Sequence, residues 1–165
     1  RRQRQMCIRD RYYTGDDGEF IYKNTYSLPI GYMTYNDPYG WEGSEAIGSG
    51  IDNQNSLIKN LTGISNVFTL TYENSTDAGF EVKPVKAGHL YMITKNTACD
   101  TVTVTIHGSE YTYKDLKKGG TIIDLGYATP DDVIVVSADT SMNACVYTLE
   151  TSRFTEAFNL SLIHI

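Results

Sequence analysis

The chain has 165 residues, which suffices for one domain whose core needs no disulfide bridges. Its 20 acidic and 14 basic residues give a net charge of −6; because residues 1–11 contribute five Arg and one Asp, or +4, the rest carries −10. Such an acidic body repels phosphate backbones, which argues against nucleic-acid binding. No apolar run approaches the ~18 residues of a transmembrane helix, so the segment is predicted not to span a membrane.

The two ends differ from the rest of the chain. Residues 1–11, RRQRQMCIRDR, are basic without an apolar period, and residues 160–165 read LSLIHI. Both are interpreted as translated sequencing adapters in a metagenomic fragment, and both are left out of the fold prediction. The alternative for the first is a genuine basic arm that contacts nucleic acid or anionic lipid.

Residues 12–66 are predicted to hold leading strands, an aromatic loop and a short helix. In chain order these are a loop at 12–19, extended stretches at 20–23 and 26–35, a Gly- and Pro-rich loop at 36–50 and a helix at 53–61. Asp52 or Asn53 is the expected N-cap, and Gly63 the expected stop. The apolar face of this helix consists of Leu57, Ile58 and Leu61.

Residues 67–159 are predicted to form a β-sandwich core and the start of a C-terminal helix. The expected strands lie within 67–72, 80–82, 88–95, 101–107, 109–115, 121–126, 132–139 and 144–150. The helix begins at Arg153 behind a Thr151 or Ser152 cap, with one apolar side. The predicted fold class is therefore mainly β, a jelly roll or β-sandwich with one or two short helices.

Three local patterns sharpen this prediction. Residues 101–107 alternate Thr with Val or Ile, which is typical of a half-buried strand. Residues 133–136 are apolar without a break, which predicts a strand covered on both faces in the middle of a sheet. His107-Gly108 is suited to a tight hairpin, because Gly readily adopts positive φ.

No pattern for catalysis, metal or cofactor binding emerges. Outside the tail only His89 and His107 are available as bases, and no nucleophile elbow, zinc-ligand spacing or phosphate-binding loop is present. A glycosidase with paired carboxylates stays open, because the sequence selects no pair among its acids. Cys99 and Cys145 could form a disulfide in an extracytoplasmic protein, although a core of this size does not require one.

Aromatic and amide side chains near the long loop suggest a glycan site, since sugar rings stack on aromatic faces while polar side chains bind hydroxyls. The candidates are Tyr35, Asp37, Tyr39, Trp41, Asn53, Gln54 and Asn55. The alternative is structural: Trp41 folds back as packing, and the amides cap the helix or tether the loop.

Two segments resemble a known family. NTYSLPIGYM at 24–33, followed by IDNQNSLIKNLTG at 51–63, is similar to the extracytoplasmic region of the YfhO family of bacterial polytopic membrane proteins. The similarity in layout extends over about residues 12–160, through GHLYM, DLGYATPDD and YTLETSRFTEAF. The order and spacing of these short motifs carry more weight than any one of them.

The resemblance implies a non-catalytic β-sandwich domain on the extracytoplasmic face of a Gram-positive cell membrane. The family is similar to glycosyltransferases that use polyprenyl-phosphate sugars, and is implicated in glycosylating lipoteichoic acid; the expected catalytic carboxylate lies in loops that this fragment lacks. The implied partners are a glycan or teichoic acid acceptor and the rest of the parent protein, with Lys114, Lys117 and Lys118 near an anionic acceptor. The alternatives are a free-standing carbohydrate-binding or adhesion module and a secreted glycosidase fragment.

Overall fold

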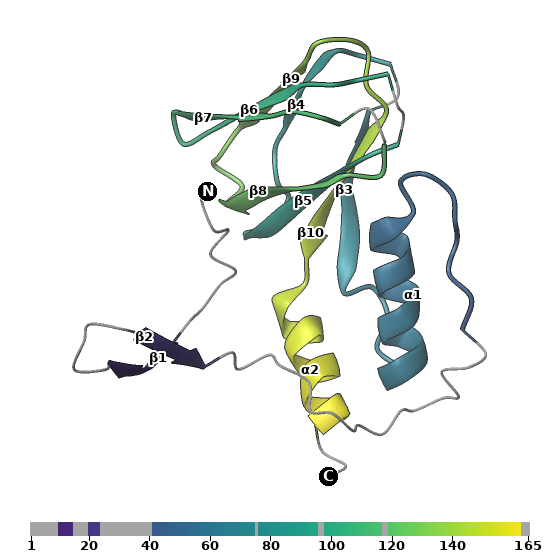
Figure 1. Cartoon of the computed structure of the whole chain (residues 1–165), viewed down its shortest axis with the longest axis vertical. Coiled ribbons are helices and arrows are strands. Elements are labelled where there is room, and N and C mark those ends of the chain that lie inside the picture. The colour runs from purple at the N-terminus through teal and green to yellow at the C-terminus, as the bar shows by residue number, and fades with distance from the viewer. Residues whose placement is uncertain are drawn as a thin grey trace.

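Two four-stranded antiparallel sheets form the body of the protein, and two helices lie beside it (Figure 1). The computed structural model describes residues 10–14, 20–23, 41–74, 76–95, 98–116 and 119–162. Sheet I has the order β3 (Phe68–Asn74), β10 (Ala144–Leu149), β5 (Gly88–Thr94) and β8 (Ile122–Ala128). Sheet II has the order β4 (Gly79–Val82), β9 (Ile134–Ala138), β6 (Val102–Ile106) and β7 (Ser109–Tyr113). The predicted mainly-β sandwich with short helices is confirmed.

The main core lies between the two sheets. In β6 the alternation predicted from the sequence is observed, since Val102, Val104 and Ile106 are buried and the threonines between them are half-buried. Sheet I contributes Leu90 and Met92 to the same cluster. Each such side chain stabilises the fold by roughly 1.5–3 kcal/mol through removal of apolar surface from water.

The uninterrupted apolar run in β9 is buried on one face, which corrects the prediction of burial on both. β9 is an interior strand, between β4 and β6, but only its alternate residues Ile134 and Val136 are fully buried. Val135 is 37% exposed, and Val133, just before the strand, is 39% exposed. The outward side of sheet II is not covered by any described element, so β-branched residues in a row reflect strand preference there rather than two-sided burial.

Helix α1 (Gly50–Thr62) packs on the outward face of sheet I. It begins three residues earlier than predicted, and the N-cap is Ser49, not Asp52 or Asn53; no side chain caps this end. The earlier start places Ile51 in the helix, and Ile51 is 1% exposed against Ile93 and Tyr147 of the sheet. That buried contact explains the extra turn.

The end of α1 matches the prediction. Gly63 adopts the left-handed conformation, with φ 76°, and its N–H donates to the Lys59 carbonyl. The predicted apolar face at residues 57, 58 and 61 is half-buried. Helix α2 (Thr151–Leu162) lies beside α1 (Figure 1).

Helix α2 begins at Thr151 itself, so Thr151 and Ser152 are its first residues rather than its cap. Ala157 is 4% exposed, while Phe154 and Phe158 are half-buried, as an apolar side requires. The helix continues through Leu160 and so crosses the boundary that the sequence suggested at residue 160. Within the described residues, neither helix is long and apolar enough to cross a membrane.

Near the N-terminus, β1 (Asp10–Thr14) pairs with β2 (Phe20–Lys23) in an antiparallel hairpin. β2 is the strand predicted at 20–23. The loop predicted at 12–19 is wrong for residues 12–14, which belong to β1; two of them are tyrosines, which favour strands. The rest of that loop and the extended stretch at 26–35 lie outside the described residues, as does the loop at 36–50 up to residue 40.

The β6–β7 hairpin has the tightest connection in sheet II among the described residues. Ile106 pairs with Ser109, so His107 and Gly108 form a two-residue turn. Both have positive φ, 50° and 73°, as a type I′ turn requires. The predicted hairpin is confirmed, and it fixes the register that places the next tyrosines.

Candidate functional site

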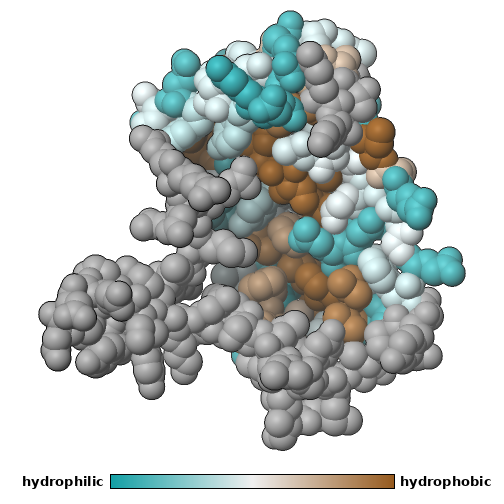
Figure 2. All heavy atoms as spheres, in the orientation of Figure 1, coloured by the Kyte–Doolittle hydropathy of each residue, from teal (hydrophilic) through white to brown (hydrophobic). Residues whose placement is uncertain are grey.

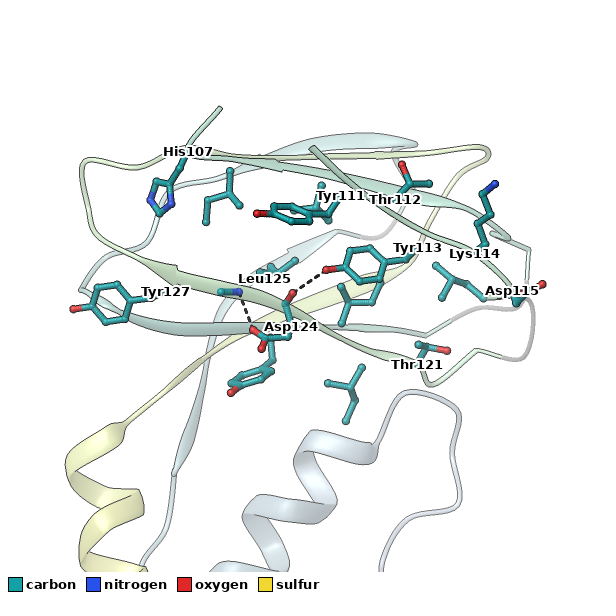
Figure 3. Close-up of a pocket in the computed structure, with 17 residues that line it drawn as sticks. His107, Tyr111, Thr112, Tyr113, Lys114, Asp115, Thr121, Asp124, Leu125 and Tyr127 are labelled. Carbon is teal, nitrogen blue, oxygen red and sulfur yellow. Dashed lines mark hydrogen bonds between the residues drawn. The ribbon is translucent and has the colours of Figure 1, made fainter. Parts of the chain in front are cut away.

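A groove opens along the edge of the sandwich where β7 of sheet II faces β8 of sheet I (Figure 3). Its volume is about 1000 Å³, and its lining comes mainly from β7, β8 and the chain between them. Figure 2 shows hydrophobic surface in the middle of this face of the molecule, below the hydrophilic residues along the top. A groove of this size can hold a small ligand.

Two tyrosines of β7 project into the groove. Tyr111 pairs with Val104 and Tyr113 with Val102, so both rings lie on the inward face of sheet II, where the valines are buried. Tyr111 is nevertheless 51% exposed, because β8 does not reach across to cover it. An aromatic ring that points inward but remains open to solvent is available to a ligand.

Tyr113 connects the two edges of the groove. Its hydroxyl donates to the main-chain oxygen of Asp124 in β8, with 3.2 Å between the oxygens (Figure 3). Next to this contact, β8 is irregular: the pairing with β5 shifts at Leu90/Tyr91, and Gly126 has φ 84°. The Asp124 carboxylate accepts from the Gly126 N–H at 2.8 Å, so it holds the irregular segment in shape.

The floor of the groove is closed. Five apolar side chains of the lining are each less than a tenth exposed: Val104, Ile106, Leu116, Ile123 and Leu125. Ile122, also in the lining, is 37% exposed. The core beneath is therefore complete without any added side chain. A ligand in this groove lies on the surface against Tyr111 rather than filling a gap in the core.

Polar residues stand at both ends of the groove. His107 lies at one end, and Lys114, Asp115 and Thr121 lie at the other (Figure 3). His107 Nε2 is 3.1 Å from the carboxylate of Asp132. The pKa of Asp132 is lowered by hydrogen bonds from the Thr129 N–H and hydroxyl, and further by His107.

A second aromatic pair lies at the His107 end. Tyr127 of β8 is 52% exposed and makes an edge-to-face contact with His89, with 5.5 Å between the ring centroids. In Figure 3 the Tyr127 ring points away from Tyr111. It belongs to the groove lining and adds an aromatic ring at this end.

Of the seven residues predicted from the sequence to bind glycan, the four that the structure describes do not line the groove. Tyr35, Asp37 and Tyr39 are outside the described residues. Trp41 donates from Nε1 to the Ser56 hydroxyl at 3.1 Å and packs over Gly43, where an added Cβ would be 3.0 Å from its ring. Trp41 thus rests on helix α1 and does not line the groove.

Asn53 and Asn55 hold the chain around α1. Asn53 binds both the N–H and the carbonyl of Ser44, at 2.8 and 2.7 Å, and so tethers the loop. Asn55 does the same for Phe68, at 2.8 and 2.7 Å, and so joins the helix to the start of β3. Gln54 is exposed between them. For Asn53 and Asn55 these contacts agree with the structural alternative, in which the amides tether the loop. A glycan role for the seven predicted residues stays a prediction.

Three described carboxylates have lowered pKa values, which does not suit the role of a general acid. Burial opposes ionisation of Asp139 and Glu150, but hydrogen bonds outweigh it, and the pKa of each is lowered, as it is for Asp132. A general acid needs a raised pKa. In the parts of the chain that the structure describes, no group of three or more His, Cys, Asp or Glu side chains could hold a metal ion.

Both described cysteines are free and buried, so the disulfide that the sequence left open is not formed here. Burial raises the pKa of the Cys99 thiol to about 11, with Asp139 adding to the effect. Burial also raises the pKa of Cys145, although Lys95 opposes the change. Neither thiol is a nucleophile at neutral pH.

The groove tyrosines were not among the residues singled out from the sequence, although Lys114, expected near an anionic acceptor, lies in the groove lining. The alternation in SEYTYKD does place Tyr111 and Tyr113 on one face of a strand, which was the available signal. The sequence does not show that the facing strand leaves them uncovered. Comparisons of the chain with protein-family models, curated proteins and solved structures found no significant match.

Proposed function

We propose that the chain is a non-catalytic glycan-holding β-sandwich domain whose binding site is the groove between β7 and β8. The observation that carries the proposal is Tyr111, which points inward from β7 yet is 51% exposed above a closed apolar floor. Sugar rings have apolar faces that stack on such an aromatic ring, and polar side chains at the ends of the groove suit their hydroxyl groups.

The closed floor argues against a peptide strand, which is the main alternative ligand for an open edge of a sandwich. A peptide strand that completes a sandwich inserts apolar side chains into an open core. Here the core residues beneath the groove are already buried, with Val104 1% exposed and Ile123 2% exposed. A flat ligand that lies on the tyrosine is the better fit to this surface.

We place the domain at the extracytoplasmic face of a YfhO-like membrane protein of Gram-positive bacteria. The support is the order and spacing of the motifs at 24–33 and 51–63. In that setting the parent protein would transfer a sugar from a polyprenyl-phosphate carrier, and this domain would hold the glycan or teichoic acid acceptor near the membrane. The uninterrupted gene tests this placement, which requires hydrophobic spans on both sides of the segment.

A free-standing carbohydrate-binding or adhesion module is the second candidate. The feature that favours it is the complete core, because the two sheets bury their shared face without a further chain. The gene sequence separates the two candidates, since this module requires no flanking spans. Both candidates require that the groove binds a glycan.

The groove is tested by glycan-array screening of the whole chain, followed by calorimetry on the best ligand. Tyr111→Ala is expected to weaken binding by about tenfold or more, because the ring supplies the stacking surface. Tyr111→Phe should retain most of the affinity. Leu70→Ala is the matched control, since Leu70 is 55% exposed on the distant edge strand β3. Blank arrays for the folded chain, or binding unchanged in Tyr111→Ala, would overturn the proposal.

A further inference from the structure

We infer that the groove binds an internal stretch of an oligosaccharide, about three sugars long, rather than a single terminal sugar. The inference rests on the proposed binding function and adds the length of the ligand to it. The features that carry it are the length of β7, the spacing of two tyrosines along that strand, and the polar residues beyond its two ends.

The groove runs along the whole of β7. His107 and Lys114, which lie beyond the two ends of this strand, both belong to the lining (Figure 3). A strand rises by about 3.4 Å per residue, so the five residues of β7 extend over roughly 17 Å. One pyranose unit, built from single bonds of about 1.5 Å, lengthens a sugar chain by about 5 Å. About three units therefore match the length of the strand.

The volume of the groove agrees with this length. It is about 1000 Å³, which is at the upper end of the range of roughly 300–1,000 Å³ that is typical of sites for drug-sized ligands. A single sugar is smaller than such a ligand and would leave most of the groove to solvent. A stretch of several sugars uses the groove from end to end.

Two aromatic rings follow one another along the strand. Tyr111 is the middle residue of β7, and Tyr113 follows two positions later, so both rings are on the same face. The two residues are about 7 Å apart along the strand, which is close to the length of one sugar unit. Tyr111 is 51% exposed and Tyr113 is half-buried, with its ring held by the hydrogen bond to Asp124. Neighbouring sugars can therefore stack on neighbouring rings.

The polar residues at the two ends are held in place. At one end, His107 Nε2 lies 3.1 Å from the carboxylate of Asp132. At the other end, the main-chain oxygen of Thr121 accepts from the Thr94 N–H, with 3.2 Å between the two atoms. Imidazole and hydroxyl groups both exchange hydrogen bonds with sugar hydroxyls. His107 and Thr121 are thus placed to bind the outer sugars of a stretch whose middle sugar stacks on Tyr111.

The test measures how binding to the whole chain depends on the length of the ligand. The probes are cello-, malto- and chito-oligosaccharides of one to six sugars, and their affinities are measured by calorimetry. In the series that binds, we expect the affinity to rise about a hundredfold from one sugar to three, because the added sugars reach Tyr113 and the polar ends. From four sugars to six it should change by less than about twofold, since the longer chains extend beyond β7.

Two variants separate the ends of the groove from its middle. Thr121→Val keeps the shape of the side chain, and His107→Gly suits the positive φ of the turn. Each should weaken tetrasaccharide binding by about threefold or more and leave disaccharide binding within about twofold of wild type. Tyr111→Ala should weaken both by about tenfold. Leu70→Ala, on the distant edge strand, should change neither.

The possible results separate the length of the ligand from the binding function. A monosaccharide that binds within about threefold of its hexasaccharide would refute the inferred length and leave the binding function standing. The same holds if affinity still rises from four sugars to six, or if both end variants bind the tetrasaccharide like wild type. Where the glycan array identifies another sugar, its length series is judged by the same criteria. If no probe binds and the array is also blank, the proposed function itself fails.

Discussion

The two edges of the sandwich are built differently. At one edge, Tyr72 of β3 stacks on Phe80 of β4, with 5.2 Å between ring centroids and 18° between the planes. At the other edge, the Tyr113 hydroxyl donates to the main-chain oxygen of Asp124 in β8, while Tyr111 remains 51% exposed. Aromatic residues point inward at both edges. Whether such a residue closes the edge or stays open to a ligand therefore depends on the facing strand and not on the residue type.

The connections explain this difference. β3 and β4 are joined across residues 74–79, and the buried Asn74 amide donates to the carbonyls of Asp77 and Met142, at 2.8 and 2.6 Å. β7 and β8 are joined by a longer segment, in which Asp115 and two glycines have positive φ. The short β3–β4 connection, with its own hydrogen bonds, keeps the two sheets in contact at that edge. The longer β7–β8 connection leaves the opposite edge open.

Phe80→Ala is the strongest way to break the sealed edge. It should cost about 3–5 kcal/mol of unfolding free energy, because it removes a large side chain that is 8% exposed and strands the Tyr72 ring. Urea unfolding followed by circular dichroism measures the change. Tyr111→Ala, at the open edge, should cost less than about 1 kcal/mol. Equal losses in the two variants would show that the edges do not differ in packing.

Asn74→Ala tests the link that closes the first edge. The variant leaves the Met142 and Asp77 carbonyls without their amide partner, at a cost of about 1–3 kcal/mol. The same unfolding experiment applies, with the exposed Asn159→Ala in α2 as the control. A loss no larger than that of the control would mean that this amide is not what holds β3 to β4.

Tyr113→Phe removes the hydrogen bond that the Tyr113 hydroxyl donates across the open edge. We expect a loss of about 0.5–1.5 kcal/mol, since the ring remains in place. Amide hydrogen exchange should quicken in β8 but not in β3. Tyr111→Phe, which alters a hydroxyl in the same strand, is the matched control and should leave both the unfolding curve and β8 exchange unchanged.

Acidification is expected to lower the stability of the protein through protonation of Glu150, near β3. This is the smallest of the effects predicted here. Its carboxylate accepts from Thr69 and pairs with Lys86; burial opposes ionisation, but these partners outweigh it and lower its pKa. A lowered folded pKa stabilises the protein above the ordinary glutamate value of 4.5, and that stabilisation is lost as pH falls through the folded pKa. Glu150→Gln should flatten the stability curve below that pH by less than about 1 kcal/mol. If the stability of Glu150→Gln fell with pH in the acid range just as it does in the wild type, this role would be contradicted.

Local periodicity was enough to predict all eight strands of the sandwich, because alternation and turn residues are encoded within a few positions. The start of α1 could not be predicted in the same way. Ile51 is drawn into the helix by Ile93 and Tyr147, which are far away in the sequence. Likewise, residues 133–136 indicate a strand but not whether a neighbour covers its second face.

The site was harder to predict than the fold, for the same physical reason. Trp41 is the lone tryptophan and attracted attention, yet it donates to Ser56 on the adjacent helix. Tyr111 is one of thirteen tyrosines, and only the distance between two edge strands gives it access to a ligand. Such openness is a property of the tertiary arrangement that no short motif contains.

The position of β10 bears on how the protein is made. This strand comes last among those of sheet I, but it lies between β3 and β5 and pairs with both. On the ribosome, β3 therefore emerges early and stays without its neighbour until residues 144–149 have been synthesised. The domain is expected to acquire its structure in one late step after translation of β10, rather than strand by strand as it leaves the exit tunnel.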